Sequence, residues 1–541
     1  MDRWVRENEL AVLVLGWLVI AVAWVGLAVA ANGPGMLYDE AWLAQQGRAF
    51  VEPLREGLMP PGTQKTWLLG RPFPLFALPY LGSLKSQLLI PSLALFGNEL
   101  ATVRLTTLGT ALAALLATML AARRIFDLRV ALLCGALVAT DPTIFFHAQW
   151  EWGPFTTGWL CRALGAVLLL RGYALERRGA TLAGSFALGL GVYNRADFVL
   201  IGAATLLGLA LFHRAALRDV WNRRRGELAA ATALLCVGAL PMLLNAGRVF
   251  GGMGQLTTRG DFTERVNTLL STLDGSYPHR LMSVGGRYEA LATVDAPVAL
   301  LGIAAVAALV ACGVEAARRG RAALSDGRGA VAVATAAIAA AMLALPGATR
   351  AHHMLNLAPF VHLLVAAQLV READRGGARR GIAAVAGIAV LASGAASIAS
   401  TRSLIERTGG RGWWSAAIVE LASDLDADDV VVSLDWGFHL QLMFSTTHPR
   451  VIEPFWRIGL DLEMLGQWSH LGSPSTLYLV HDRPYDRFGY GPRFLQAMAA
   501  LGDDALTRIH RDREGEPAFY SVRIARPHRL HLDRRGFSVE F

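Results

Sequence analysis

Two adjacent carboxylates, Asp39 and Glu40, follow the first long apolar run of the chain. A carboxylate within hydrogen-bond reach of a hydroxyl can take its proton as that hydroxyl attacks an electrophile. Partial burial beside a membrane should raise the pKa of such a carboxyl toward a useful value, and nearby lysines and arginines should oppose that shift. Neighbouring residues of a helix point to different sides, so the two carboxylates cannot share the task equally. The local sequence leaves Asp39 either a general base or merely the N-cap of the next helix.

The segment after this pair has the pattern of an amphipathic helix. Leu43, Gly47, Phe50 and Leu54 recur at three- and four-residue spacing, and the charged residues lie between them. This periodicity predicts a helix that lies in the membrane interface, with its apolar side toward the lipid.

A third carboxylate lies between two tryptophans, in the stretch Gln149-Trp150-Glu151-Trp152-Gly153-Pro154. Arg162 follows inside the next apolar run, about 12 Å from Pro154 along a helix. An arginine inside a membrane span costs roughly 2.5–3.5 kcal/mol, so it should have a partner or face a cavity. Glu151 or a bound phosphate could be that partner, and snorkelling of the side chain toward water is the alternative.

Lys85 is one of only two lysines in the chain, and the other is Lys65. Lys85 lies in the stretch Tyr80-Leu81-Gly82-Ser83-Leu84-Lys85-Ser86, between apolar segments. A lysine in this position often only snorkels to the membrane surface. A compact cation close to the headgroup plane is also what a lipid-phosphate site needs.

Two further polar motifs lie at turns between apolar runs. Arg195 and Asp197 are close enough in sequence to pair and stabilise a tight turn. His352 and His353 are adjacent, so they lack the spacing of four that places two metal ligands on one helix face. Hydrogen bonding to a sugar or a phosphate is therefore favoured over zinc, and no divalent metal or other cofactor is expected. Without a nucleotide-binding loop, an activated substrate must arrive in another form, and a lipid-linked donor fits.

The elements that must position these residues are membrane spans. The chain has 541 residues, of which 54% are hydrophobic and 17% charged, with a mean hydropathy of +0.39. Soluble domains carry about 25% charged residues, so this composition belongs to the membrane class. The four cysteines lie singly in apolar stretches, which excludes a disulfide framework. Runs long enough to be helical spans occur near 10–31, 103–122, 130–147, 155–173, 180–193, 197–212, 228–247, 297–316, 330–346, 353–370 and 381–400.

The arginines indicate which side each loop faces. They gather in short alternate loops, which the positive-inside rule places in the cytoplasm together with the N-terminus. The net charge of +8 therefore does not indicate a nucleic-acid partner. The first run is too long for a cleaved signal sequence, whose apolar core has roughly 7–15 residues, so we expect it to be retained. The opposite side receives 32–102, 148–154, 248–296, 347–352 and the tail from 402.

The tail changes character. Strand-like runs at 430–434, 476–480 and 519–522 alternate with a helix-like stretch at 494–501. This alternation predicts a small α/β domain. The predicted fold class is thus an α-helical polytopic membrane protein of about eleven transmembrane helices, residues 1–401, followed by an extracytoplasmic α/β domain, residues 402–541.

Taken together, the motifs resemble the GT-C glycosyltransferases, and specifically the bacterial relatives of protein O-mannosyltransferases and of the lipid A aminoarabinose transferase (family 39). The resemblance covers roughly residues 10–370, and its specificity lies in the order of motifs that are individually weak. In the tail, only Ser433-Leu434-Asp435-Trp436-Gly437 is similar. The stretches that carry the resemblance are Tyr38-Asp39-Glu40, Tyr80–Ser86, Gln149–Pro154, Tyr193-Asn194-Arg195-Ala196-Asp197-Phe198 and His352-His353.

The resemblance implies a polyprenyl-phosphate sugar donor, an outward active site and inversion at the anomeric carbon. It implies that Asp39 is the essential acid and that Lys85 contacts the donor phosphate. Glu151 departs from the aspartate that relatives often carry there, and Arg195 from the lysine that many carry. The expected catalytic set is Asp39, Glu40 and Glu151, and the expected donor-phosphate and substrate-binding set is Lys85, Arg162, Arg195, His352, His353 and Tyr80.

The leading hypothesis is therefore a glycosyltransferase of the bacterial inner membrane, acting on an extracytoplasmic hydroxyl of a protein, lipid or envelope glycan. A lipid or solute transporter is a second hypothesis, but transporters tend to show two similar halves, and the sequence shows no such symmetry. A third is a non-enzymatic protein of envelope assembly, which would leave Asp39 and Lys85 unexplained.

The arginine asymmetry generates a topology prediction. A reporter enzyme that works only outside the cytoplasm should be active when fused after Phe541 and inactive when fused after Arg224, inside an arginine-rich loop. Measuring reporter activity in intact cells checks both fusions. Cytoplasmic placement of Phe541 would mean an even number of spans and would move the site to the other face.

Overall fold

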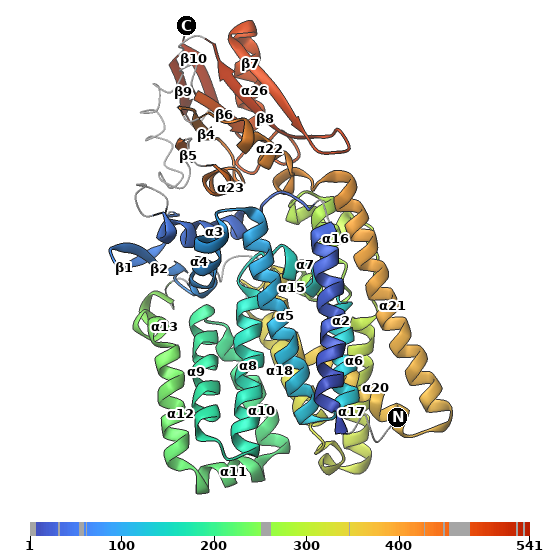
Figure 1. The fold of residues 1–541 in the computed structure, drawn as a ribbon. Coiled ribbons are helices and arrows are strands. Elements are labelled where there is room, and N and C mark those ends of the chain that lie inside the picture. The colour runs from blue at the N-terminus through green and yellow to red at the C-terminus, as the bar shows by residue number, and fades with distance from the viewer. Residues whose placement is uncertain are drawn as a thin grey trace.

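The computed structural model of the chain describes residues 7–30, 33–52, 59–60, 62–249, 251, 261–345, 347–426, 428–446, 450–453, 476–525, 529–533 and 536–540. Its main body is a bundle of roughly parallel and antiparallel helices, with a smaller domain seated on one end (Figure 1). All eleven predicted apolar runs are helical. They correspond to α2 (Glu9–Ala30), α5 (Leu100–Ile125), α6 (Leu128–Ala139) with α7 (Pro142–Gln149), α8 (Phe155–Ala174), α9 (Arg178–Asn194), α10 (Phe198–Phe212), α12 (Arg225–Gly238) with α13 (Leu240–Leu244), α17 (Leu301–Arg319), α18 (Arg328–Ala344), α20 (Phe360–Asp374) and α21 (Gly377–Thr408).

Fewer of these helices satisfy a strict criterion for a membrane span. By length and composition, five segments in the described part of the chain qualify: Glu9–Val29, Leu100–Ile125, Leu301–Arg319, Ala351–Asp374 and Gly377–Thr408. The number rises to seven if two bent pairs each count as one span, α6 with α7 (68°) and α10 with α11 (Arg214–Arg223, 101°). The remaining helices are shorter or more polar and lie beside the others in the bundle (Figure 1). The predicted helical membrane class is confirmed.

The shorter helices are held in the bundle by close packing against their neighbours. Gly189 of α9 and Gly238 of α12 each lie so near the facing backbone that a Cβ atom would clash with a carbonyl oxygen, of Leu235 and Phe186 respectively. Small residues allow helices to approach closely where no hydrophobic effect drives them together in lipid. The bend between α6 and α7 follows from sequence, because Asp141 caps α7 by accepting from the Thr143 backbone N–H at 2.8 Å, with Pro142 in the first turn.

The segments expected on one side of the membrane gather at one end of the bundle. Helices α3 (Tyr38–Val51), α4 (Leu84–Phe96) and α16 (Tyr277–Ser283) lie there with the C-terminal domain, whereas α11 and the N-terminal end lie at the opposite end (Figure 1). Between α3 and α4 a small antiparallel sheet is formed by β1 (Gln64–Leu68), β2 (Arg71–Leu78) and β3 (Leu81–Gly82). Short elements complete this end: α13, α15 (Phe262–Leu273), η1 (Tyr288–Thr293) and α19 (Ala351–Met354).

The expectation that the segment after Asp39 is an interfacial amphipathic helix is wrong in one respect. The helix forms as α3, but most of its residues are buried, including the polar Gln45, Gln46 and Arg48. The reason is that α4 packs on one side of α3 and the C-terminal helix α23 (His439–Ser445) packs on another. Helix α3 is therefore buried between the bundle and the C-terminal domain.

The C-terminal domain is the predicted α/β domain. Its five-stranded sheet has the order β5-β4-β6-β8-β7, where β4 (Val430–Ser433) is parallel to β5 (Arg450–Ile452) and β6 (Thr476–Val480), and β8 (Pro517–Ile524) is antiparallel to β6 and β7 (Ala505–Arg511). Helices α22 (Ala417–Asp424), α23 and α26 (Gly491–Ala500) accompany the sheet, and β9 (Arg529–Asp533) pairs with β10 (Gly536–Glu540). The expected boundary at 401/402 falls inside α21, which ends at Thr408.

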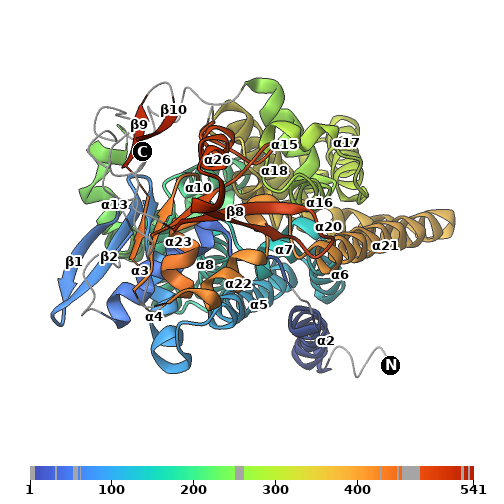
Figure 2. The same cartoon turned by 90° about the horizontal axis from the view of Figure 1, so that it is seen from above.

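Burial on both faces explains why the central strands read as continuous apolar runs. Val431 and Leu477 pack with Phe438 on one face of the sheet, and Val432 and Tyr478 lie in a second apolar cluster with Phe494 on the other. Seen from above, this domain covers the middle of the bundle, while α2 stands at the periphery (Figure 2).

A buried arginine joins the two parts of the molecule. The Arg48 guanidinium donates to the carbonyl oxygens of Met443 (2.7 Å), Phe444 (2.7 Å) and Thr446 (2.9 Å), at the C-terminal end of α23. The last carbonyls of a helix have no partner within that helix, so a buried helix end needs donors from elsewhere. Tyr38 adds an aromatic contact, because its ring stacks on Trp436 of the C-terminal domain at a centroid distance of 4.7 Å.

This junction generates a stability prediction. Arg48→Leu should lower the stability of the contact by about 2–4 kcal/mol, because it leaves buried carbonyl oxygens unpaired. Limited proteolysis should then release fragments from residues 409–541 at lower protease concentration. The control Arg508→Leu removes an exposed ion pair with Asp424, which contributes at most about 1 kcal/mol, and should change little. Equal protease resistance of both variants would contradict the assigned role of Arg48.

Candidate functional site

Asp39 lies half-buried in the first turn of α3, at the end of the bundle that the C-terminal domain covers. The interpretation of Asp39 as an N-cap is wrong, because the N-cap position is Leu37 and no described backbone N–H donates to the Asp39 carboxylate. Burial raises the pKa of the Asp39 carboxyl above its ordinary value, and the guanidinium groups of Arg487 and Arg350 partly lower it again. Both directions agree with expectation, although the opposing cations are arginines from distant parts of the chain.

Glu40 points elsewhere and has a different environment. Its carboxylate accepts from the Leu37 backbone N–H at 3.2 Å and pairs with Arg104 of α5, whose Nε lies 3.2 Å from Oε1. Arg104 also donates to the carbonyl oxygens of Pro34 (3.1 Å) and Gly35 (3.0 Å). This buried group therefore holds the segment before α3 in place. As expected, the two adjacent carboxylates point to different sides of the helix and make different contacts.

Arg487 reaches the Asp39 region from the C-terminal domain. Its guanidinium carbon lies 4.9 Å from the ring centroid of Trp436 and 5.6 Å from that of Trp413, so two indoles hold it by cation–π contacts. The backbone N–H of Arg487 donates to the Asp435 carboxylate at 3.2 Å. Asp435 and Trp436 belong to the Ser433–Gly437 motif, which thus orients the arginine.

Arg350 reaches the same region from the turn before α19. Its guanidinium carbon lies 3.8 Å from the centroid of the Tyr288 ring, and its Nη1 donates to Glu264 at 2.9 Å. Sequence reasoning missed Arg350, Tyr288 and Arg487 as members of this site. Arg350 could have been found, because it lies two residues before His352 of the His352-His353 motif, whereas Arg487 lies in a loop with no recognisable signal.

Lys85 and Glu151 form a buried ion pair. The Lys85 ammonium contacts one carboxylate oxygen of Glu151, which also accepts from the Thr156 hydroxyl at 2.9 Å. Glu151 is therefore the partner of Lys85 and not of Arg162. Lys85 also lines a small cavity between α4, α5 and α8. The other residues that line this cavity are mostly threonines: Thr106, Thr107, Thr110, Thr156 and Thr157, with Leu88 and Leu89.

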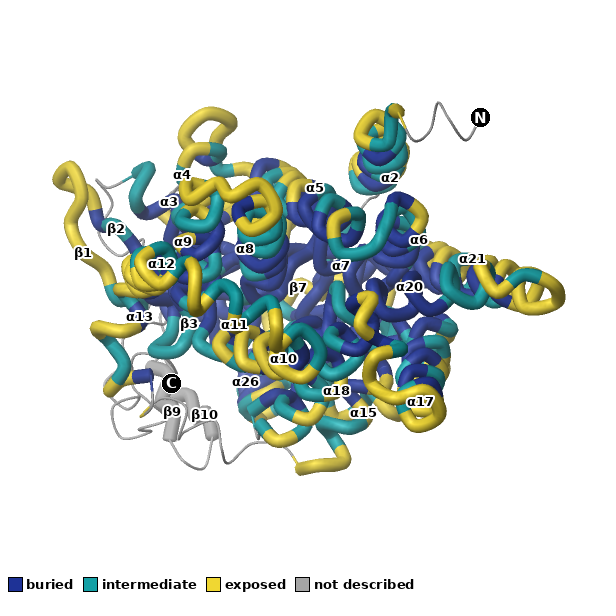
Figure 3. The backbone as a smooth tube through the Cα atoms, turned by 90° about the horizontal axis from the view of Figure 1, so that it is seen from below, coloured by how far each residue is buried: buried dark blue, intermediate teal, exposed yellow. Residues whose placement is uncertain are grey.

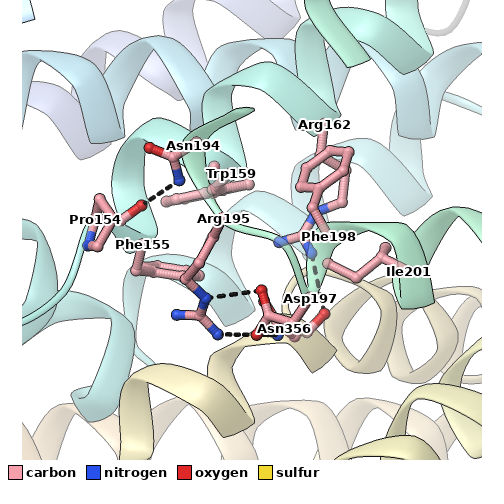
Figure 4. Close-up of a pocket in the computed structure, with 11 residues that line it drawn as sticks. Pro154, Phe155, Trp159, Arg162, Asn194, Arg195, Asp197, Phe198, Ile201 and Asn356 are labelled. Carbon is pink, nitrogen blue, oxygen red and sulfur yellow. Dashed lines mark hydrogen bonds and ion pairs between the residues drawn. The ribbon is translucent and has the colours of Figure 1, made fainter. Parts of the chain in front are cut away.

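Arg162 is satisfied by backbone instead. Its guanidinium donates to the carbonyl oxygens of Asn356, at 3.0 Å, and Ala358, at the irregular segment between α19 and α20. Carbonyls at a break in a helix have no intrahelical partner, so they satisfy an arginine within the bundle without a carboxylate. The side chain borders a small cavity, whose lining residues are drawn in Figure 4.

Arg195 and Asp197 also line this cavity (Figure 4). Arg195 pairs with Asp197, with Nε 2.7 Å from Oδ1, which confirms the predicted turn-stabilising pair. The Arg195 guanidinium also donates to the His352 carbonyl at 3.0 Å and lies 3.2 Å from Nδ1 of His353. The Tyr80 carbonyl accepts from the Ala196 backbone N–H at 3.1 Å, which brings the turn between β2 and β3 against the turn that holds Arg195. Arg162, Arg195, His352, His353 and Tyr80 are thus collected at one place.

The charges in these places are arranged differently. Lys85 with Glu151, and Arg195 with Asp197, are direct pairs, whereas Asp39 faces two guanidinium groups without a hydrogen bond from any described side chain. Within the described ranges, no group of three or more His, Cys, Asp or Glu side chains could hold a metal ion. A partly buried carboxylate that faces two cations is suited to proton abstraction next to a developing negative charge.

No protein-family model matches this chain, and no curated protein sequence matches it. Solved structures do. ArnT from Cupriavidus metallidurans, in the apo state and bound to undecaprenyl phosphate, matches with 15% identity and a TM-score of 0.54, over 95% of this chain and 98% of ArnT. The oligosaccharyltransferase of Archaeoglobus fulgidus, in complex with zinc and sulfate, matches with 14% identity and a TM-score of 0.49, over 82% of this chain and 62% of that one. The chain therefore has the fold of ArnT, which confirms the expected fold.

The buried Lys85–Glu151 pair generates a second stability prediction. Either Lys85→Met or Glu151→Gln alone should destabilise the protein by roughly 3–5 kcal/mol, because each leaves the other charge buried without its partner. The double variant should recover most of that loss in thermal unfolding. The exposed pair Arg129–Asp374, put through the same double-mutant cycle, should show little coupling. Strictly additive losses at Lys85 and Glu151 would exclude the pair.

Proposed function

We propose that this protein is an inverting glycosyltransferase that moves a sugar from a polyprenyl-phosphate donor to an acceptor hydroxyl on the outer side of the bacterial inner membrane. The observation that carries the proposal is the Asp39 carboxylate. It is half-buried, its pKa is raised, and it faces Arg350 and Arg487 at the end of the bundle that the C-terminal domain covers. The GT-C fold supports the same reaction class.

The chemistry follows from these groups. As the acceptor hydroxyl attacks the anomeric carbon, Asp39 takes its proton and a new carbon–oxygen bond forms. The bond from the anomeric carbon to the phosphate oxygen breaks, and the lipid phosphate leaves with the electron pair. Attack from the face opposite the phosphate inverts the anomeric centre. The departing phosphate needs little acid assistance but gains from a nearby cation, which Lys85 would supply.

The cavity beside Lys85 is the proposed place for the donor phosphate. Threonine hydroxyls and one ammonium group line it, and a phosphate there would compete with Glu151 for the Lys85 charge. ArnT has been solved with undecaprenyl phosphate bound, and this supports a polyprenyl phosphate as the lipid partner here. Arg162, Arg195, Tyr80, His352 and His353 would then border the neighbouring substrate space. No divalent metal is part of the proposal, and the acceptor is left open.

The proposal requires Asp39 to act as the general base. Asp39→Asn should lower turnover by roughly 10²–10⁴, the usual contribution of a general base, while expression and donor binding persist. The measurement is transfer of radiolabelled sugar from polyprenyl phosphate by purified protein. Glu289→Gln, an exposed carboxylate beside Tyr288, is the matched control and should retain full turnover. Near-normal turnover of Asp39→Asn would remove Asp39 from the chemistry and leave Glu151 as the candidate base.

Arg487 gives a pH prediction for the same reaction. Because Arg487 lowers the pKa of Asp39, Arg487→Gln should raise that pKa further. Asp39 acts as the ionised base, so the acid limb of kcat/KM against pH should then move to higher pH. Arg483→Gln, an exposed arginine of the same loop, should leave the limb where it is. A limb that moves to lower pH, or moves equally in both variants, would contradict the contact between Arg487 and Asp39.

A further inference from the structure

The β1–β2 hairpin projects sideways from the bundle and ends in an apolar tip. Exposed fractions are 67% for Trp67, 45% for Leu68 and 88% for Leu69. In the side view the hairpin lies near the level of α3 and α4, and in the view from above it lies outside the ring of helices (Figures 1 and 2). The view from below shows the outer strand exposed along its length (Figure 3).

The turn itself is unusual for a hairpin in water. Leu68 pairs with Arg71, so Leu69 and Gly70 form a two-residue turn, with φ values of +54° and +73°. A turn with positive φ at both central residues favours asparagine, aspartate or glycine at its first position, because a side chain there is strained. The chain has leucine there, a large apolar side chain almost fully exposed. Both the strain and the exposure are unfavourable in water, and an apolar surrounding would remove the second cost.

The residues around the tip fit the boundary of a lipid bilayer. Trp67 is the residue type that favours the membrane interface, with its ring at headgroup level. Lys65 lies with its Nζ 5.6 Å from the centroid of the Trp67 ring, which places a cation where lipid phosphates would be. The tip end of the hairpin is tied to α3, because Arg71, the residue directly after the turn, donates to the carbonyl oxygens of Phe50 (3.2 Å) and Val51 (2.9 Å) at the end of that helix.

A second hairpin of the same chain provides the contrast. The β7–β8 hairpin of the C-terminal domain ends in Arg513, Glu514, Gly515 and Glu516, all exposed, and its left-handed residue is the glycine. This tip has the polar composition expected of a turn in water. The two hairpins therefore differ in the environment that their tips suit.

We propose that the tip Trp67-Leu68-Leu69 inserts into the outer-leaflet interface of the membrane around the bundle, with Lys65 at the phosphate level. The hairpin then fixes the height of α3, and of Asp39 at its start, relative to the headgroups of the bilayer. The occupant of the surface is lipid and not a protein partner. This inference concerns a membrane contact and does not depend on which reaction the site catalyses.

The experiment labels each hairpin tip in the full chain. Leu69→Cys and Glu516→Cys are made in a background in which the exposed Cys236 is replaced by serine, and each carries an environment-sensitive fluorophore. The proteins are placed in nanodiscs of phosphatidylcholine and phosphatidylglycerol. Quenching is then measured with spin-labelled lipids and, separately, with aqueous iodide, after thermal unfolding has shown that both variants fold like the parent.

The expected result is blue-shifted emission at residue 69, with several-fold stronger quenching by lipid than at residue 516 and correspondingly weaker quenching by iodide. Equal quenching by iodide at both tips would overturn the proposal, because the tip would then lie in water. Protection of residue 69 from both quenchers would overturn it as well, because the tip would then be covered by protein, such as a second copy of the chain.

Discussion

The candidate site depends on the contact between Arg48 and the end of α23. A guanidinium group buried between the bundle and the C-terminal domain is stabilised by three carbonyl oxygens at the end of α23 and by the Glu52 carboxylate, 3.2 Å from its Nε. With α23 held on α3, Trp436 stacks on Tyr38, next to Asp39 in the sequence. Trp413 and Trp436 hold the guanidinium group of Arg487, whose charge lowers the pKa of Asp39. The environment of Asp39 is thus made by segments far from it in the sequence, those of Arg350 and Arg487.

The polar groups of the bundle fall into two kinds, and the difference is one of charge compensation. Lys85 with Glu151, and Arg195 with Asp197, are direct pairs whose partners offset the cost of burying each charge. The buried charge of Arg162 is instead compensated by backbone carbonyl oxygens. Asp39 is held neither by a described hydrogen bond nor by a direct ion pair, and burial raises the pKa of its carboxyl. A group left in this state is available for chemistry, whereas the paired groups are committed to structure or need a ligand to compete for them.

How far the sequence predicts the molecule differs from element to element. The apolar runs were placed on helices throughout, because a hydrophobic run of sufficient length has few other solutions. The strands at 430–433 and 476–480 were found for a similar reason, since burial on both faces leaves a continuous apolar run. The surroundings of α3 were not predicted. Its apolar periodicity would be the same whether its apolar side packed on lipid or on helices α4 and α23. The partner of Glu151 was missed too, because pairing depends on which helices meet, and Arg162 and Lys85 were equally charged candidates.

The sequence by itself determined the fold class, the α/β nature of the tail, the pairing of Arg195 with Asp197 and that Asp39 and Glu40 point to different sides of their helix. These are matters of composition, of periodicity and of residues within a few positions of one another, where the backbone geometry leaves little choice. Only the tertiary structure decided that Arg350 and Arg487 face Asp39, that Lys85 meets Glu151 and that the tip of the β1–β2 hairpin is exposed. Those facts depend on contacts between distant segments, because the charge that a carboxylate experiences is set by the groups that folding brings near it and not by its neighbours in sequence.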